Sequence, residues 1–370
     1  MRKSSWSVLV VSILIALLIA PPPAWSWGNT GHQAVAFVAW NLLDQPTKDK
    51  IFALLHQVHA RTTPTKKTIA GFDEWSQGLP DGLSEDQQHM YIFMRAATWA
   101  DSIKHVGLSD SDTPPTKNGD SNIGFTDTFS HGYWHFEDTA FGAAATAHSK
   151  PPIVPKSCWV SVKGVKTPPT PVKALPKTPV PDAATEINLL SAALASGEAD
   201  PLKAYDMVWL EHLVGDIHQP LHASVRYVKG IGDEGGNCVD ITITHLSPDN
   251  RANFKSSNPK ADPPDELHAF WDDLPGVGTA METQKAADYA ASLSAADTGL
   301  AAITDVDTWA KESFDMAKKD AYAAPIGPAL GRPTSYQITD DYYTTAAADA
   351  KARIALAGAR LAAMLTADLK

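Results

Sequence analysis

Cysteine is scarce in this sequence, and N-glycosylation signals are absent. Among 370 residues there are two cysteines, Cys158 and Cys238. They allow one disulfide in an oxidising compartment, and two unpaired buried thiols are the alternative, because nothing in their spacing favours pairing. The chain has no N-x-Ser/Thr acceptor, so N-glycosylation is not expected. This absence favours a bacterial periplasmic or secreted protein.

Positive charge is also in short supply. The chain has 31 Lys and Arg residues against 42 Asp and Glu residues, which gives a formal net charge of -11 at pH 7. Such a balance argues against a binder of long duplex nucleic acid, since that affinity comes mainly from cationic contacts to phosphate. An anionic substrate must therefore find positive charge locally, and metal ions are one source of it.

A short apolar run, WSVLVVSILIALLIA, follows Arg2 and Lys3 near the N-terminus. It is too short to favour a membrane span, and the small residues Ala24 and Ser26 follow it at cleavage positions. We therefore predict that residues 1–26 are a cleaved signal peptide and that the mature chain begins at Trp27, in the periplasm or outside the cell. The alternative is an uncleaved anchor whose flanking tryptophans lie at the lipid interface.

Helical spacing of apolar residues dominates the rest of the chain. It occurs in residues 31–43, 184–197, 204–219 and 350–369. Residues 149–182 form a Pro-rich insert, and residues 224–244 predict a β-hairpin around a glycine-rich turn. Because the chemical motifs are spread over residues 27–272, we predict a single compact, mainly α domain over residues 27–370, with a small β-hairpin and long loops.

Two histidine–aspartate pairs lie in helical stretches. His212 and Asp216 are four residues apart, which places them on one face of a helix. Pro220 should bend or end this helix and let His222 point toward the same cavity. His268 and Asp272 repeat the spacing. In such apolar surroundings an uncompensated aspartate is costly, and a bound metal ion removes that cost.

Spacing alone does not establish a metal site. In a chain with 13 histidines and 42 acidic residues, about one and a half His-x-x-x-acid matches arise by chance. His245 and Asp249, in a predicted loop, form one more match, and a buried His–Asp hydrogen bond is the alternative for each helical pair. Asp101 in RAATWADSIK and His135 in GYWHFED are further candidates, although each taken singly is more often a helix cap or a satisfied core group.

The motifs WGNTGH, WAD, WHFED, HLVGDIHQPLH, GGN and LHAFWDDL occur in this order along the chain. In that order they closely resemble the zinc-dependent single-strand-specific nucleases of the S1/P1 type. The resemblance implies a mainly helical fold of the kind shared with the zinc phospholipases C. It also implies three Zn²⁺ ions per chain in one cleft.

The same resemblance implies a set of ligands for each zinc ion. One zinc is expected to bind Asp101, His135, His212 and Asp216, and a second to bind His222, His268 and Asp272. The third is expected to bind the α-amino nitrogen and carbonyl oxygen of Trp27, together with His32 and a bridging Asp216. Cleavage before Trp27 would then create a ligand, because a free amine binds a metal ion and an amide nitrogen does not readily do so.

The activity implied by the resemblance is hydrolysis of single-stranded DNA and RNA to 5'-phosphate products, together with 3'-nucleotidase activity. A hydroxide at the zinc pair that shares Asp216 is expected to attack phosphorus, with no covalent intermediate. Phe136 is expected to stack on a base, Asp138 to bind the base or orient water, Lys104 to lie near phosphate, and Asn237 to offer a polar contact. Ordinary packing, capping or surface charge is the alternative for these four residues.

The sequence departs from the family pattern in several places. It allows one disulfide where relatives often carry two, and residues 107–128 and 149–182 are longer than the common core requires, which makes both candidates for the rim of the cleft. A phospholipase C is the alternative enzyme, although that class has Glu where this chain has Asp272. A zinc-stabilised protein without activity is the alternative outside the enzymes. We expect no stable protein partner, and no membrane association after signal cleavage.

Overall fold

The computed structural model describes residues 27–63, 65–104, 106, 108, 124–127, 129–147, 149, 154, 158–162, 165–178, 182–257, 262–330 and 335–370. The predicted signal peptide, residues 1–26, lies outside the described residues. So do most of the stretch at 107–128 and parts of the Pro-rich insert.

The described chain is mainly α-helical, as the sequence predicts. Its α-helices are α1 Asn29–Leu42, α2 Gln45–Leu55, α3 Phe72–Trp75, α4 Glu85–Ala96, α5 Trp99–Ile103, α6 Ala183–Leu194, α7 Asp200–Asp216, α8 Pro248–Ala252, α9 Leu267–Asp272, α10 Thr283–Ala291, α11 Thr298–Ala301, α12 Val306–Met316 and α13 Asp340–Asp368. Shorter helical segments are η1 Gly124–Thr126, η2 Gly132–His135, η4 Pro220–Ala223 and η5 Ala317–Ala321. Each of the four stretches with helical spacing overlaps one helix: α1, α6, α7 or α13.

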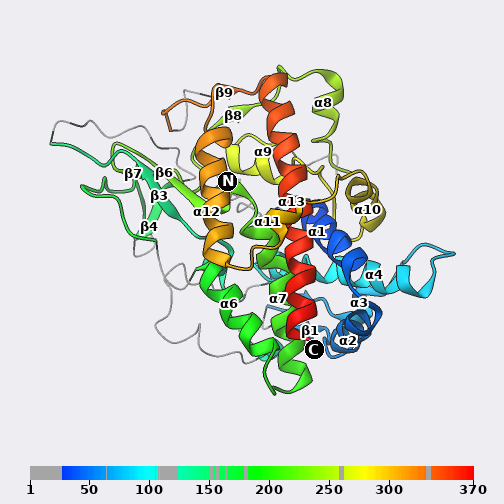
Figure 1. The fold of residues 1–370 in the computed structure, drawn as a ribbon. Helices are drawn as coiled ribbons and strands as arrows, with labels where there is room; N and C mark the ends of the chain where they lie inside the picture. Colours follow the sequence, from blue (N-terminus) through cyan, green and yellow to red (C-terminus); the bar gives the residue numbers. More distant parts are fainter. Residues whose placement is uncertain are drawn as a thin grey trace, which may run out of the picture.

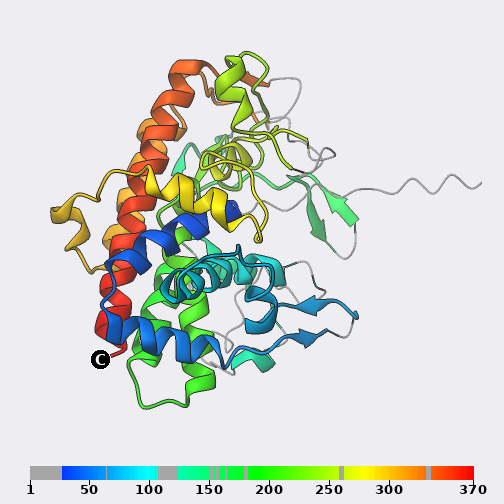
Figure 2. The same cartoon turned by 90° about the vertical axis from the view of Figure 1, so that its right-hand side faces the viewer.

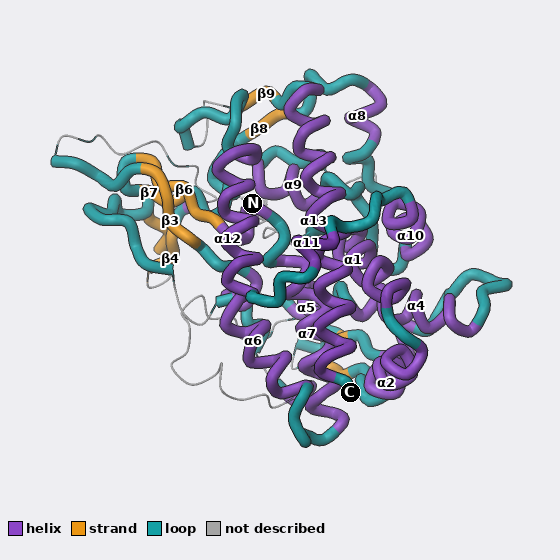
Figure 3. The backbone as a smooth tube through the Cα atoms, in the orientation of Figure 1, coloured by secondary structure: helices purple, strands orange, loops and turns teal. Residues whose placement is uncertain are grey.

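The strands are short and lie at the edge of the helical body (Figure 3). They are β1 Arg61–Thr62, β2 Thr68–Ile69, β3 Thr139–Gly142, β4 Val160–Val162, β5 Val165–Thr167, β6 Ser224–Val228, β7 Ile231–Gly232, β8 Ile241–Thr242 and β9 Tyr336–Gln337. β3, β6 and β7 form a three-stranded sheet in that order, in which β3 and β6 are parallel. The other strands pair as β1–β2, β4–β5 and β8–β9.

Helix α7 is the central element of the fold. It packs against α1, α2, α5, α6 and α13 (Figure 1). The long helix α13 runs along one side of the molecule, opposite the projecting β1–β2 ribbon (Figure 2). One hydrophobic cluster of buried side chains extends from Trp27 to Leu369 and includes Trp40, Trp209 and Trp271. Residues 204–216 of α7 therefore lie in the interior, where side-chain geometry is fixed by packing.

The C-terminal end of α7 is determined by the proline that follows it. A proline disfavours helical backbone at the residue before it, and Gln219 has the extended values φ −83° and ψ 121°. The helix thus ends at Asp216, three residues earlier than the spacing predicts, and His222 falls in η4. The following turn is anchored to α12 and α13, because Ser313 Oγ donates to Ile217 O (2.5 Å) and Arg353 Nε donates to His218 O (3.1 Å).

The predicted hairpin is confirmed, and its turn lies near the start of the predicted stretch. β6 and β7 are antiparallel, with Val228 paired to Ile231, so the turn consists of Lys229 and Gly230. Both turn residues have positive φ, 50° and 84°, as a tight two-residue hairpin turn requires. The glycine-rich stretch at 233–237 follows β7 instead, and β8 beyond it pairs in parallel with β9. The glycines alone do not show which of these two turns closes the hairpin, because this depends on how the strands pair.

Cys158 and Cys238 form a disulfide, with their Cα atoms 5.9 Å apart. The bond resolves the choice between one disulfide and two buried thiols. It joins the Pro-rich insert to the loop that follows β7. Within the described residues, no helix is both long and apolar enough to cross a membrane.

Candidate metal centre

The eight predicted histidine and aspartate ligands are all buried, and they gather in two neighbouring clusters. The first cluster holds His32 from α1, Asp101 from α5, His135 from η2, and His212 and Asp216 from α7. The second cluster holds His222 from η4, and His268 and Asp272 from α9. The two clusters are directly linked, since the Nδ1–H of His222 donates to the backbone oxygen of His135 (2.7 Å).

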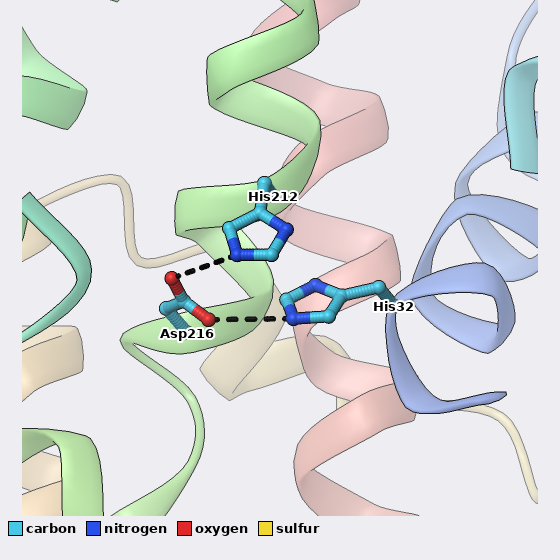
Figure 4. A group of neighbouring side chains, drawn as sticks. All are labelled: His32, His212 and Asp216. Carbon is cyan, nitrogen blue, oxygen red and sulfur yellow. Dashed lines mark ion pairs between the residues drawn. The ribbon is translucent and has the colours of Figure 1, made fainter. Parts of the chain in front are cut away.

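Asp216 occupies the middle of the first cluster, and its two carboxylate oxygens face different histidines. Oδ2 lies 2.8 Å from His135 Nδ1 and 3.3 Å from His212 Nε2, whereas Oδ1 lies 3.4 Å from His32 Nε2. Figure 4 shows Asp216 between His212 and His32. A carboxylate placed in this way is suited to bridge two metal ions, one on each side.

The approach of His32 to α7 depends on a glycine. A Cβ atom at Gly215 would lie 2.8 Å from His32 Nδ1, so a larger residue there would displace the histidine. The rings of His32 and His212 stack with their centroids 3.8 Å apart. Asp101 completes the cluster, with Oδ1 3.6 Å from His212 Nε2.

The second cluster has a similar geometry. The Nε2 atoms of His222 and His268 are 3.1 Å apart. Asp272 Oδ2 lies 3.6 Å from His268 Nε2, and Asp272 Oδ1 lies 4.0 Å from His222 Nε2. Ligand atoms around a tetrahedral zinc ion are about 3.3 Å apart when the zinc–ligand bonds are 2.0–2.1 Å long. The spacing of these side chains therefore fits a zinc ion.

Backbone carbonyls fix the tautomers of three of these histidines. Nδ1 of His212 is 2.8 Å from Ala97 O, and Nδ1 of His268 is 2.7 Å from Gly235 O. A carbonyl oxygen only accepts hydrogen bonds, so each of these Nδ1 atoms, like that of His222, carries the hydrogen. In the neutral rings, the Nε2 lone pairs then point inward. Such orientation by outer hydrogen bonds is typical of metal-binding histidines.

This arrangement is suited to a cation. The two Nε2 lone pairs of His222 and His268 face each other at 3.1 Å, where neither can donate a hydrogen bond to the other. Burial lowers the pKa of His268 to about 3 and also lowers the pKa of His222, so neither ring readily takes up a proton. Burial likewise raises the pKa of Asp272 well above its usual range, because an isolated ionised carboxylate is costly in the interior. A metal ion would stabilise all three groups.

The first cluster has a different electrostatic balance. Burial lowers the pKa of His32 to about 4 and that of His135 to about 3. Burial would raise the pKa of Asp216, but His212 and His135 outweigh it and hold that pKa well below its usual value. Asp216 is therefore ionised while two of the rings beside it are neutral, which is the donor set that zinc prefers.

Trp27 lies next to both clusters. Its side chain is fully buried, and its Cδ1 would be 3.9 Å from a Cβ atom at Gly215, close to His32. The amide N–H of Gly28 donates to the backbone oxygen of Asp272 (3.0 Å), so the Trp27–Gly28 peptide lies against the second cluster. The predicted ninth ligand residue is thus in the same region as the other eight.

Of the four predicted substrate-contacting residues, Phe136 and Lys104 contact residues of the clusters. Phe136 is half-buried, with its ring centroid 5.7 Å from that of His222. Asp138 has a positive φ of 25°, and burial, together with the nearby Asp233 and Asp182, raises its pKa to about 6.

Lys104 and Asn237 make contacts that the sequence does not predict. Lys104 Nζ is 2.8 Å from Asp101 Oδ1, so its ammonium group contacts a predicted metal ligand. The side-chain amide of Asn237 donates to Glu234 O (2.6 Å) and so holds its own turn.

Sequence reasoning missed one contributor to the site, Gln219, and assigned no specific role to Gly235 of the GGN motif. Gln219, fully buried, donates from Nε2 to Asp272 Oδ1 (2.7 Å) and accepts from the backbone N–H of Leu221 with its Oε1 (2.5 Å). Gly235, with φ 61°, presents its carbonyl to His268, and a Cβ atom there would lie 2.6 Å from Leu221 O. The polar Gln219 between two predicted ligands, in DIHQPLH, was the available signal.

Two buried clusters of histidine and aspartate in a mainly helical fold form the donor sets of a candidate metal-binding protein. The family model described as S1/P1 Nuclease matches residues 27–370, and the chain belongs to the S1/P1 nuclease family. The resemblance inferred from the motifs is thereby confirmed. Members of this family are metal-dependent hydrolases that act on phosphodiester bonds.

Two plant proteins are among the relatives. The chain is 29% identical to Endonuclease 4 of Arabidopsis thaliana over 192 residues, which cover 46% of this chain and 54% of that protein. It is also 29% identical to Endonuclease 5 of the same plant over 176 residues, 43% of this chain and 49% of that protein. The chain spans about half the length of the curated relatives that it matches.

Proposed function

We propose that this protein is a zinc-dependent endonuclease that hydrolyses single-stranded DNA and RNA to 5'-phosphate products and also removes the 3'-phosphate of nucleotides. The observation that carries the proposal is the position of Asp216, whose two oxygens face His32 on one side and His135 and His212 on the other. This arrangement suits two adjacent metal ions, and adjacent metal ions are typical of enzymes that hydrolyse phosphodiester bonds.

The proposed ligand sets are those expected from the motifs. Asp101, His135, His212 and Asp216 would hold one zinc ion, and His222, His268 and Asp272 a second. Trp27, through its α-amino nitrogen and carbonyl oxygen, would hold a third with His32 and Asp216. Bound zinc lowers the pKa of water and stabilises negative charge on phosphate and on the departing oxygen.

The chain's own residues would orient the substrate and the ligands. Phe136, half-buried beside His222, offers an aromatic face to a base, and such a face is accessible to an unpaired base only. Asp138 would accept a hydrogen bond from that base or from water. Lys104 would balance the charge of Asp101 and approach the phosphate, and Gln219 would keep Asp272 oriented.

We further propose that residues 27–370 form one nuclease domain and that residues 1–26 are removed on export to the periplasm or to the outside of the cell. Parallel assays of the purified mature protein test the substrate class. Single-stranded DNA, RNA and a 3'-nucleotide should be hydrolysed, and phosphatidylcholine should not. Hydrolysis of phosphatidylcholine alone would replace the nuclease proposal by a phospholipase C.

The N-terminus provides a separate prediction. A protein made with one extra residue before Trp27 has an amide in place of the α-amine, and an amide nitrogen has no lone pair free for a metal ion. This variant should fold and retain about two zinc ions, because the other ligands lie far along the chain, but it should cleave single-stranded DNA slowly. Zinc analysis, cleavage rates and mass spectrometry of the N-terminus provide the measurement.

Proteolytic removal of the extra residue serves as the control and should restore both the third zinc ion and the rate. A second control adds one residue after Lys370, which should change neither quantity. Equal zinc content and equal rates with and without the N-terminal extension would refute the role of Trp27 as a ligand.

A further inference from the structure

Positive charge is concentrated in one segment of this acidic chain. Between Thr139 and Pro181 the sequence contains no Asp, Glu or Arg, whereas the whole chain carries 42 acidic residues and a net charge of -11. The segment contains six lysines: Lys150, Lys156, Lys163, Lys166, Lys173 and Lys177. Such a segregation of charge is typical of a surface that binds a polyanion.

The described lysines of this segment are exposed, and one of them lies beside a further exposed lysine. Lys166, Lys173 and Lys177 are exposed, and so is Lys229 at the tip of the β6–β7 hairpin. The backbone N–H of Val172 donates to Gly230 O (2.8 Å), which places Lys173 beside the turn that carries Lys229. We call these four exposed lysines, with the backbone of residues 165–178 and 224–232 that carries them, the lysine arm.

The sheet that supports the lysine arm is connected directly to the metal centre. β3 begins four residues after His135, and β6 begins two residues after His222. The two strands are parallel, and at their base the N–H of Glu137 donates to His222 O (2.7 Å). Figure 1 shows β3, β4, β6 and β7 together on one side of the helical body. A single-stranded nucleic acid that left the metal centre on this side would pass along the sheet.

Two further contacts hold the segment beside the site. Oγ1 of Thr139 and Oγ1 of Thr178 are 3.4 Å apart, and the N–H of Ala183 donates to Phe136 O (3.0 Å). Both ends of the segment between Thr139 and Pro181 therefore lie next to Phe136. Lys177 directly precedes Thr178, the residue that contacts Thr139. The disulfide between Cys158 and Cys238 is a third attachment of the segment. Cys238 is three residues from Gly235, whose backbone oxygen accepts a hydrogen bond from His268.

We infer that the lysine arm is a docking track for the sugar-phosphate backbone of single-stranded nucleic acid, on the side of the metal centre where β3 and β6 lie. This inference rests on the proposed function, and it extends the substrate contact beyond the nucleotides at the scissile bond. Exposed ammonium groups on flexible side chains attract phosphate without reading sequence. The acidic remainder of the molecule repels the same strand, so binding is confined to this track.

The test is a fourfold variant, Lys166→Gln, Lys173→Gln, Lys177→Gln and Lys229→Gln. On a single-stranded 20-mer, the slope of log(kcat/KM) against log[NaCl] should become shallower by about 2 to 3, because each lost lysine–phosphate contact removes about 0.7. At 50 mM NaCl, kcat/KM should fall on the order of tenfold. A 3'-nucleotide has no sugar-phosphate backbone that could extend along the track, and its hydrolysis rate is the internal reference.

A matched variant controls for the loss of four positive charges. Lys66, Lys67, Lys351 and Lys370 are exposed residues outside the lysine arm, and Lys66 has a positive φ like Lys229. Their replacement by Gln should leave the salt slope unchanged. An unchanged slope in the arm variant, while the wild-type protein cleaves the 20-mer, would overturn the inference.

Binding separates this inference from the proposed function. Fluorescence anisotropy of the metal-loaded protein with a phosphorothioate 20-mer should show the same loss of affinity and of salt dependence in the arm variant. If the wild-type protein cleaves no single-stranded substrate, the proposed function fails, and the binding measurement alone decides on the track. Equal affinities of the wild-type and arm variants for the phosphorothioate 20-mer would then refute it.

Discussion

Replacement of Asp216 by Ala is expected to lower kcat on single-stranded DNA by on the order of 10³-fold or more. The carboxylate lies between His32 and His135, 3.4 Å from one and 2.8 Å from the other, so its loss disturbs two proposed metal positions at once. It also leaves buried rings that were oriented toward a shared anion. Zinc analysis and single-turnover cleavage rates of the purified variant provide the measurement.

Lys104→Met is the comparison. Lys104 contacts the cluster through Asp101 alone among the predicted ligands, at 2.8 Å, so its loss should cost about 10- to 100-fold, as is typical of groups that orient a ligand. Near-native turnover of Asp216→Ala, or a larger loss in Lys104→Met, would contradict the assignment of Asp216 as the bridging ligand.

Removal of metal by exhaustive dialysis against a chelator is expected to abolish cleavage and to lower Tm by on the order of 10 °C. The physical reason is the burial of the ligands: the Nε2 lone pairs of His222 and His268 face each other at 3.1 Å, and a cation between them would stabilise this contact. Metal ions that bind the native state alone add their binding free energy to its stability. Cleavage rates and thermal unfolding before and after dialysis measure both effects.

Readdition of zinc to the dialysed protein should restore activity and Tm together, whereas Mg²⁺ should restore neither, because imidazole ligands favour zinc. A dialysed sample that is free of metal and retains its full cleavage rate would show that the two clusters are ordinary buried hydrogen-bonded groups.

The local features of this fold could be predicted from the sequence. Helices α1, α6 and α7 are close to the stretches with helical spacing, because that spacing reports which residues face the core. α13 begins at Asp340, ten residues before the predicted start. Its first turns carry few large apolar residues, and the helix is started by Thr339, whose side chain accepts from the N–H of Tyr342 (3.3 Å).

The non-local features could not be predicted in the same way. Pairing of β3 with β6 joins segments 85 residues apart (Thr139 with Ser224), and no local pattern encodes it. The backbone carbonyls that orient His212 and His268 belong to Ala97 and Gly235, whose side chains carry no signal for this role. The ligand residues themselves were predictable, because their order along the chain resembles a family pattern. The atoms that orient those ligands become visible only in three dimensions.

Zinc content and nuclease activity, measured on one sample whose N-terminus is shown by mass spectrometry to be Trp27, test the central claim most directly. We predict three zinc ions per chain and rapid cleavage of single-stranded DNA by that sample. A protein that starts at Trp27 and cleaves single-stranded DNA with no more than one zinc ion per chain would contradict it.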